Sequence, residues 1–343
     1  MSLSYNHPKS LVALAALVAA PLFAQDPTQE LSTVTVVGKA EDLLGEATAA
    51  SKGQTSSEEL LSRPVLRRGE ILEAIPGMIV TQHAGGGKAN QYFLRGFNLD
   101  HGTDFATSID GMPMNMRTHA HGQGYTDLNG LIPEVVRSLD YVKGTYTAAN
   151  GDLSTAGSAN FNLFDFLDRN IASFEIGENN YYRGLIAGSI RLDSPVAPAE
   201  GPLVTGAKNA GKNPQPVSPE GPIQGLTYAL EYNTYDGPWA LPEDFQRWNG
   251  LLRYFNGTED DYFTATLMGY KGEWNSSDQI PNRAIKDGRI DRFDNVDPTT
   301  GGESQRYSLN VAWQTTDGDV VTKGNVYGIY YDLDLFSNFT YFL

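Results

Sequence analysis

Three of the chain's five histidines fall in one stretch, at His101, His119 and His121. The last two form a His-x-His pair, and in an extended segment alternate residues point to the same side of the backbone. With a third ligand from His101 or Asp104, the pair would make a zinc, nickel or copper site. Three methionines lie close by, and their soft thioether sulfurs would favour copper(I). These are Met112, Met114 and Met116.

The same histidines have other uses. They can donate hydrogen bonds to an organic ligand, or they can simply be polar residues of an exposed loop. A secreted zinc hydrolase would need a general base held in a pocket that excludes water. No residue near the His-x-His pair clearly supplies that base, so turnover of an ester or phosphate would be needed to support this interpretation.

Composition narrows the class of protein. The chain has 343 residues, of which 36 are glycine, 18 tyrosine and 15 phenylalanine, and this mixture suits many short strands and turns. Its formal charge of -16 argues against binding to nucleic acid, which requires basic surface. There is no cysteine, so disulfides and thiolate metal sites are excluded.

The elements around the histidines read as strands. An apolar run ends at Arg95-Gly96, and a second, from 105 to 109, is closed by Asp110-Gly111, a strong hairpin signal. A third strand is expected from 139 to 142, and a fourth at the alternating Ala159, Phe161 and Leu163. In order, the motifs are LRGF, IDGMPMN, IPEVVRSLDYVKG and GSANFNL.

This series of motifs resembles the plug domain of TonB-dependent outer-membrane receptors, which carry scarce nutrients across the Gram-negative outer membrane. The likeness extends from about Leu31 to the end of the chain. It implies a mainly β fold, in which an α+β plug precedes an antiparallel transmembrane β-barrel in outer-membrane lipid. It also implies transport rather than enzyme activity, no cofactor, and TonB with its inner-membrane energising complex as partner. The ligand would be a scarce nutrient, such as a metal chelate or siderophore.

The expected domains follow from this likeness. Residues 1–24 have one lysine and a short apolar run, as in a signal peptide cleaved after Ala24. Residues 25–52 form a periplasmic segment with an isolated β-prone island at 31–37, where the family has its TonB box, a strand added to TonB's sheet. The residues expected to bind TonB are Thr33, Val34, Thr35, Val36 and Val37. The plug would occupy residues 53–168.

Residues 169–343 are expected to be the N-terminal part of the barrel. Period-two alternation predicts seven strands, at about 170–178, 181–193, 224–236, 246–257, 260–273, 304–315 and 319–336. We expect the aromatic residues of each strand, including Tyr327 and Tyr331, to face lipid. Seven strands cannot close around a plug, and an open edge in lipid is costly, so we expect a truncated receptor. The long connection at 193–221 reads as a disordered insertion.

The resemblance also implies a place for the ligand. In the family, outer loops of the plug contribute to the ligand site, and the matching segments here are 98–104 and 115–127. The residues expected to bind ligand are Asn98, His101, Arg117, His119, His121, Gln123 and Tyr125. A bound metal would use His101, His119 and His121.

Four further segments carry expectations. Residues 57–76 read as helical, and the glycine-rich 83–88 reads as a flexible loop without the Walker pattern. Arg67, Arg68 and Glu70 are candidates for ion pairs between plug and barrel. Four aspartates, Asp287, Asp291, Asp294 and Asp297, suit either calcium or a solvated acidic loop, and their spacing misses the EF-hand pattern.

Three functions therefore stay open at this point. The first is transport of a chelate. The second is direct capture of a metal ion by the histidines. The third is a surface binding protein that does not transport. Loss of uptake on deleting residues 31–37 would distinguish transport from binding alone.

Overall fold

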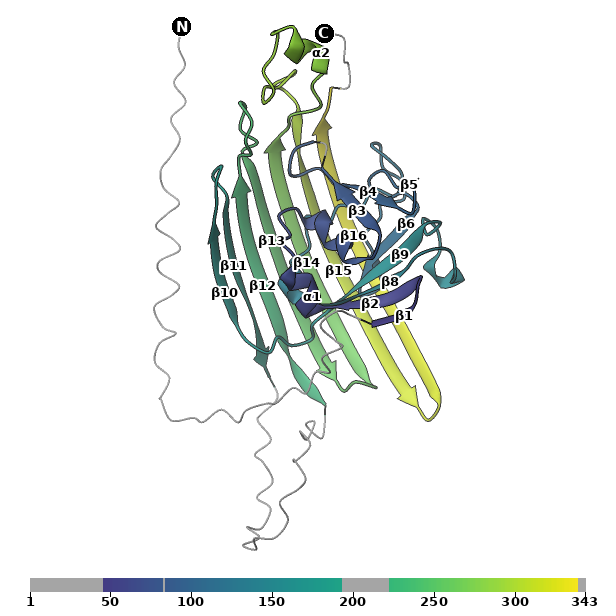
Figure 1. Ribbon diagram of the computed structural model, residues 1–343. Coiled ribbons are helices and arrows are strands. Elements are labelled where there is room, and N and C mark those ends of the chain that lie inside the picture. Colours follow the sequence, from purple (N-terminus) through teal and green to yellow (C-terminus); the bar gives the residue numbers. More distant parts are fainter. Residues whose placement is uncertain (1–45, 83, 193–221, 339–343) are drawn as a thin grey trace, which may run out of the picture. The chain divides into compact units, whose positions relative to one another are not determined.

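The computed structural model describes residues 46–82, 84–192 and 222–338. The expected signal peptide, the TonB box and the connection at 193–221 lie outside these ranges. Among the described residues, no helix is long and apolar enough to cross a membrane. Two parts follow each other along the chain, an N-terminal domain up to about residue 168 and a C-terminal sheet (Figure 1).

The N-terminal domain is built on a six-stranded sheet in the order β1-β2-β8-β9-β6-β7. Its strands are β1 (Glu46–Ala49), β2 (Lys52–Ser56), β6 (Phe105–Ile109), β7 (Met112–Pro113), β8 (Val136–Val142) and β9 (Gly157–Leu163). β6 and β9 are parallel, and the other pairs are antiparallel. The expected hairpin is confirmed, because Asp110 and Gly111 join β6 to β7 with φ of 45° and 78°, as a type I′ turn requires.

Short elements cover one face of this sheet. A second sheet contains β3 (Met78–Thr81), β4 (Gln91–Leu94) and β5 (Phe97–Asn98). The helical segment consists of α1 (Ser57–Ser62) and the 3₁₀ turn η2 (Arg68–Ala74), with further 3₁₀ turns η3 (Pro133–Val135) and η4 (Ala148–Asn150). The Ser56 hydroxyl caps α1 by accepting from Glu59 N at 3.3 Å.

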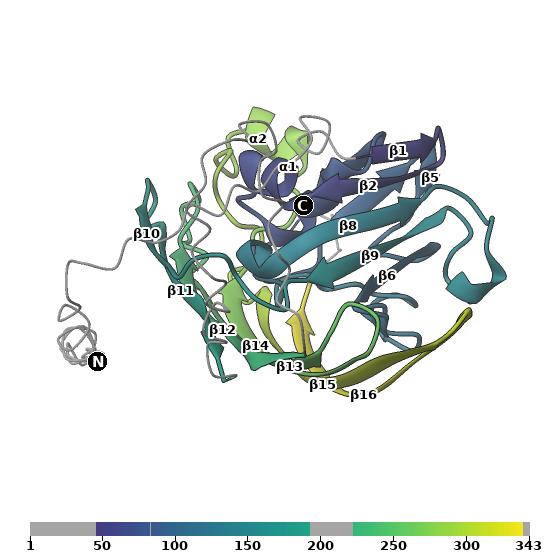
Figure 2. The same ribbon diagram turned by 90° about the horizontal axis from the view of Figure 1, so that it is seen from below.

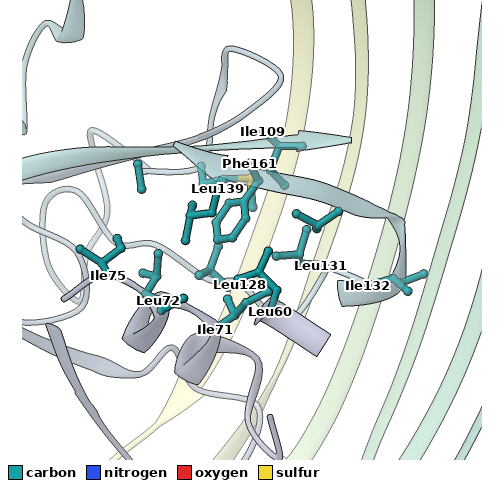
Figure 3. Close-up of a cluster of buried hydrophobic side chains, with 14 of the residues drawn as sticks. Leu60, Ile71, Leu72, Ile75, Ile109, Leu128, Leu131, Ile132, Leu139 and Phe161 are labelled. Atoms are coloured by element: carbon teal, nitrogen blue, oxygen red, sulfur yellow. The ribbon is translucent and has the colours of Figure 1, made fainter. Parts of the chain in front are cut away.

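The core lies between this sheet and the helical segment. Phe161 and Leu139 point from β9 and β8 toward Leu60 of α1 and Leu72 of η2, and all four are at most 1% exposed (Figure 3). Burial of such side chains contributes about 1.5–3 kcal/mol each. The predicted fourth strand is confirmed, and its alternate residues Ala159, Phe161 and Leu163 are buried.

The C-terminal sheet has seven antiparallel strands in sequence order, as expected. They are β10 (Ile171–Ile176), β11 (Tyr182–Arg191), β12 (Ile223–Tyr235), β13 (Phe245–Gly257), β14 (Tyr262–Asn275), β15 (Gly301–Asp317) and β16 (Val320–Phe336). In Figure 2 the strands β8, β9 and β6 lie on the concave side of this curved sheet.

Alternation assigned most faces correctly. On β12, Leu230 is 64% exposed on the outer face and Glu231 is 1% exposed on the inner face. On β16 the prediction was wrong, because Tyr331 points inward to the N-terminal domain and Tyr330, 56% exposed, points outward. Both faces of β16 carry apolar and aromatic side chains, so periodicity alone does not tell which face points toward the N-terminal domain.

The connections divide between the two ends of the sheet. At one end lie 177–181, 236–244 and the long segment 276–300 with α2 (Asn282–Lys286), and Asp236 N donates to Asn179 O at 2.9 Å there. At the other end lie the short turns 258–261 and 318–319. The long segment 276–300 and the two short turns therefore lie at opposite ends of the sheet.

The glycine-rich loop is packed rather than flexible, which corrects the sequence prediction. A Cβ on Gly87 would approach the Trp274 ring to 1.9 Å, so the loop lies directly against β14. Gly85 N donates to Ser276 Oγ at 2.9 Å, and Gly86 N donates to Glu243 Oε2 at 3.0 Å. The absence of side chains here allows backbone contact with the C-terminal sheet.

Candidate ligand-binding site

The two candidate loops are held together by one buried side chain. Asn115 donates through Nδ2 to Gly102 O, Phe105 O and Gly124 O, each at 3.0 Å, and its Oδ1 accepts from Thr107 N at 2.7 Å. Backbone bonds complete the arrangement, with Thr126 N donating to His101 O at 2.7 Å. Sequence reasoning did not single out Asn115, although a polar residue beside a hairpin was the available signal.

The aromatic side chains of these loops form a cluster. His119 stacks on Tyr125 with ring centroids 4.2 Å apart and an interplanar angle of 4°. The His121 ring lies 4.8 Å from that of His101 and edge-on to Tyr125 at 5.9 Å. Tyr331 of β16 closes the group, 5.9 Å from His119.

Hydrogen bonds fix the protonation of two imidazoles. His119 Nδ1 accepts from His121 N at 3.2 Å, so its remaining proton lies on Nε2, and burial lowers the pKa of His119 and favours this neutral form. His101 Nδ1 lies 2.8 Å from Ala89 O, so it is the donor, and Nε2 lies 3.6 Å from Asp100.

The other expected ligand residues lie outside the cluster. Asn98 is exposed, and its side chain accepts from Asp100 N at 2.9 Å. Arg117 is exposed and pairs with Asp152 at 3.1 Å. Gln123 is also exposed, and its backbone oxygen accepts from the Thr103 hydroxyl. The structure thus gathers four of the seven candidates, which are His101, His119, His121 and Tyr125.

No three His, Asp or Glu side chains within the described residues are arranged to hold a metal ion. Of the neighbouring methionines, Met112 and Met114 are each 2% exposed in the hydrophobic core, whereas Met116 Sδ lies 3.8 Å from Arg306 Nη1. The acidic loop is occupied internally, with Asp291 N donating to Asp294 Oδ2 at 2.8 Å and Asp297 Oδ1 accepting from Thr299. Calcium capture stays a prediction.

A cavity of about 520 Å³ opens beside the cluster. Its walls come from the loop of the N-terminal domain and from the inner face of β16. The lining residues are Met116, Thr118, His119, Ala120, His121, Tyr331, Asp332, Leu333, Leu335 and Ser337. The cavity therefore offers imidazole and phenol faces, one carboxylate and a short apolar wall, a mixture that suits an organic ligand.

A buried carboxylate supports the cluster from behind. Asp127 is 5% exposed, and its Oδ2 accepts from the Tyr331 hydroxyl at 3.3 Å. Its Oδ1 accepts from Asn129 N at 2.9 Å. Burial raises the pKa of Asp127, and these two donors act against that rise.

Two ion clusters attach the N-terminal domain to the sheet. In the first, Glu231 on β12 accepts hydrogen bonds from Arg68 of η2 and from Arg183 at 2.6 Å, and it forms an ion pair with Arg247 at 3.3 Å. Burial, followed by repulsion from Arg247, lowers the pKa of Arg68 to about 10. The expected ion pair across the domains is therefore found for Arg68, while Arg67 and Glu70 pair with each other at 3.7 Å.

The second cluster has the opposite composition. Arg253 on β13 binds Asp110 of the β6–β7 turn at 2.7 Å and Asp165, in the segment that leads to β10, at 2.6 Å. Asn310 on β15 donates to Asp110 O at 3.1 Å. Burial raises the pKa of Asp110, and Arg253 opposes that rise.

The family model of the TonB-dependent receptor plug domain matches residues 45–158. The chain therefore contains a domain similar to this plug, followed by a sheet that has the fold of part of a receptor barrel. Receptors with this plug domain are transporters and not enzymes. From here on, the N-terminal domain is called the plug and the C-terminal sheet the barrel sheet.

Solved structures share this fold. The copper transporter OprC is 16% identical, with a TM-score of 0.57 over 86% of this chain and 39% of that chain. The ferric citrate transporter FecA in its unliganded form is 15% identical, with a TM-score of 0.57 over 84% and 41%. The ferric yersiniabactin uptake receptor FyuA from Yersinia pestis is 15% identical, with a TM-score of 0.54 over 84% and 42%. The chain thus spans about two fifths of the length of these structures.

Proposed function

We propose that this protein takes part in TonB-dependent transport of a metal chelate, such as a siderophore complex, across the outer membrane. The observation that carries the proposal is the convergence of one plug loop and β16 on a cavity lined by His119, His121 and Tyr331. Similar structures include transporters of ferric citrate, ferric yersiniabactin and copper, so chelated or free metal is the common cargo of these neighbours.

The chemistry of the cavity favours a chelate over a bare ion. His119 has its Nδ1 lone pair engaged by a backbone N–H, so its free edge is an N–H donor rather than a metal ligand. An N–H donor and the face of a stacked imidazole suit the oxygen atoms and planar groups of an organic ligand. The Tyr125 ring covers the other face of His119 and holds it in place.

Direct metal capture is the second candidate. Its support is the pair His101 and His121, whose rings are 4.8 Å apart, with the Asp100 carboxylate 3.6 Å from His101 Nε2. Recruiting His119 to copper, zinc or nickel would require a rotation that frees its Nδ1 lone pair from His121 N. Titration with each metal salt alone distinguishes this candidate from chelate binding.

The experiment on the ligand is calorimetric titration of the purified full chain in detergent. The panel is ferric citrate, an iron–catecholate complex, Cu(II), Zn(II) and Ni(II), with anaerobic Cu(I) as a separate arm. One-to-one binding of a chelate but not of the bare metals supports the proposal. Binding of a bare metal alone would replace it with the second candidate.

The experiment on energy coupling uses the segment at 31–37. Cells with and without TonB produce the parent chain or a chain lacking these residues, and accumulation of the bound ligand is measured. The proposal requires accumulation that depends on both TonB and the segment. Cell-associated ligand that is independent of both would identify a surface binding protein instead.

A further inference from the structure

We propose that a relay of buried hydrogen bonds, running through Asp127 and Asn129, connects the ligand cavity to the ion cluster that holds Arg68. The proposal rests on the proposed function, because it concerns how occupancy of that cavity would be transmitted to the plug. It assigns Asp127 and Asn129 as positioning residues that act through Arg247.

The relay starts at the wall of the cavity. Tyr331 lines the cavity and donates its hydroxyl proton to Asp127 Oδ2 at 3.3 Å. The next contact joins Asp127 to Asn129, whose backbone N–H donates to Asp127 Oδ1 at 2.9 Å. A ligand that displaces the Tyr331 ring therefore removes one of the two donors that stabilise this buried carboxylate.

Asn129 then contacts the inner face of the barrel sheet. Its Oδ1 accepts from Arg247 Nη1 at 3.3 Å, and its backbone oxygen accepts from Asn249 Nδ2 at 2.9 Å. Its Nδ2 donates to Gly87 O at 3.0 Å, which ties it to the packed glycine loop. Because Asn129 is 6% exposed, water cannot readily replace these bonds.

The last steps reach the plug again. Arg247 lies 3.3 Å from Glu231 Oε1, and Asn249 Nδ2 donates to the same oxygen at 3.0 Å. The other oxygen of Glu231 holds Arg68. The chain of contacts thus crosses from barrel sheet to plug, back to the sheet, and finally to η2 of the plug.

Arg247 and Arg68 compete for Glu231, so a change at Asn129 affects how firmly Arg68 is held. Three guanidinium groups, those of Arg68, Arg183 and Arg247, share this carboxylate, and Arg247 repels Arg68. Asn129 provides Arg247 with an acceptor outside the cluster, and Arg247 Nε has no partner among the described residues. If the hydrogen bond between Asn129 and Arg247 is lost, Arg247 moves toward Glu231 and displaces Arg68. Occupancy of the cavity would therefore loosen η2.

Amide hydrogen exchange of residues 68–76 in the purified full chain tests the relay without any ligand. The bonded amides of this segment include Glu70 N, which donates to Arg67 O, and Ile75 N, which donates to Leu72 O, both at 3.0 Å. Y331F removes only the hydroxyl at the far end of the relay. We expect it to speed exchange in 68–76 about fivefold, and E231Q to speed it more.

The matched control is Y327F on the same strand, which lies outside the relay and should leave exchange in 68–76 unchanged. The decisive experiment combines Y331F with N129A in a double variant. If N129A does not fold, N249A takes its place. A relay predicts no further effect in the double variant, whereas independent destabilisation would be additive.

The relay is overturned if Y331F changes exchange only around residues 125–130, if its effect adds fully to that of N129A, or if E231Q leaves 68–76 unchanged. None of these outcomes depends on ligand binding or uptake. Failure of the proposed function would instead appear as no binding in the titration panel and no TonB-dependent accumulation.

Discussion

The two ion clusters between plug and barrel sheet are built with opposite charge. Around Glu231, one carboxylate with a fully buried side chain serves three arginines. Around Arg253, one arginine serves two aspartates whose side chains are 16% and 31% exposed. Buried charges need partners because desolvation is costly, whereas exposed ones are stabilised by water. The cluster at Glu231 should therefore be far more sensitive to loss of its centre.

The largest effect should come from E231A. It leaves three buried guanidinium groups without their shared carboxylate, and breaking a buried pair from one side typically costs about 3–5 kcal/mol. Denaturant unfolding of the purified chain in detergent measures the free energy of unfolding. E231Q serves as the control because it keeps the side-chain volume. A smaller loss in the free energy of unfolding for E231A than for R253M would contradict the expected difference between the two clusters.

R253M should cost less, about 1–3 kcal/mol at neutral pH, because its two aspartates retain water or other donors. Leu163 N still donates to Asp110 Oδ1 at 3.1 Å. The same unfolding experiment reports the change. T266V, which removes a minor partner of Arg253, serves as the control for local packing.

The deficit of R253M should also shrink as pH falls. Burial raises the pKa of Asp110 above its value in the unfolded chain. Between these two pKa values the folded state binds more protons than the unfolded state, so the free energy of unfolding falls as pH rises. Without Arg253 that pKa rises further. Unfolding of R253M and parent at pH 8 and pH 5 should show the smaller difference at pH 5, and an equal or larger difference would remove Asp110 from the account.

The smallest effect should come from E175Q at the rim of the first cluster. Glu175 binds Arg183 at 2.7 Å, but its side chain is 43% exposed, and exposed pairs contribute only about 0–1 kcal/mol. Since Arg183 keeps Glu134 and Glu231, the free energy of unfolding should barely change. A loss close to that of E231A would show that burial does not set the ranking.

The sequence predicted the fold better than the site because strand periodicity and turns are local signals. The seven strands and the Asp110-Gly111 hairpin were read from such signals. The alternation on β12 even indicated that Glu231 faces inward. Its partner Arg68 is 163 positions away, and no pattern in one sequence links them.

The site was predicted in part for the same reason. The histidines were noticeable because they cluster along the chain, and the fold brings them together around Tyr125. Tyr331 was missed because both faces of β16 carry aromatic residues. Asp127 and Asn115 were missed because their roles depend on backbone groups that converge only in three dimensions.

The most direct test of the account compares two of the residues first proposed from the sequence. The affinity of the chelate identified by titration is measured for parent, H119A and N98A. We expect at least about tenfold weaker binding for H119A, because His119 lines the cavity, and parental binding for N98A, because Asn98 lies outside it. Parental affinity in H119A, or a loss confined to N98A, would contradict the placement of the ligand site.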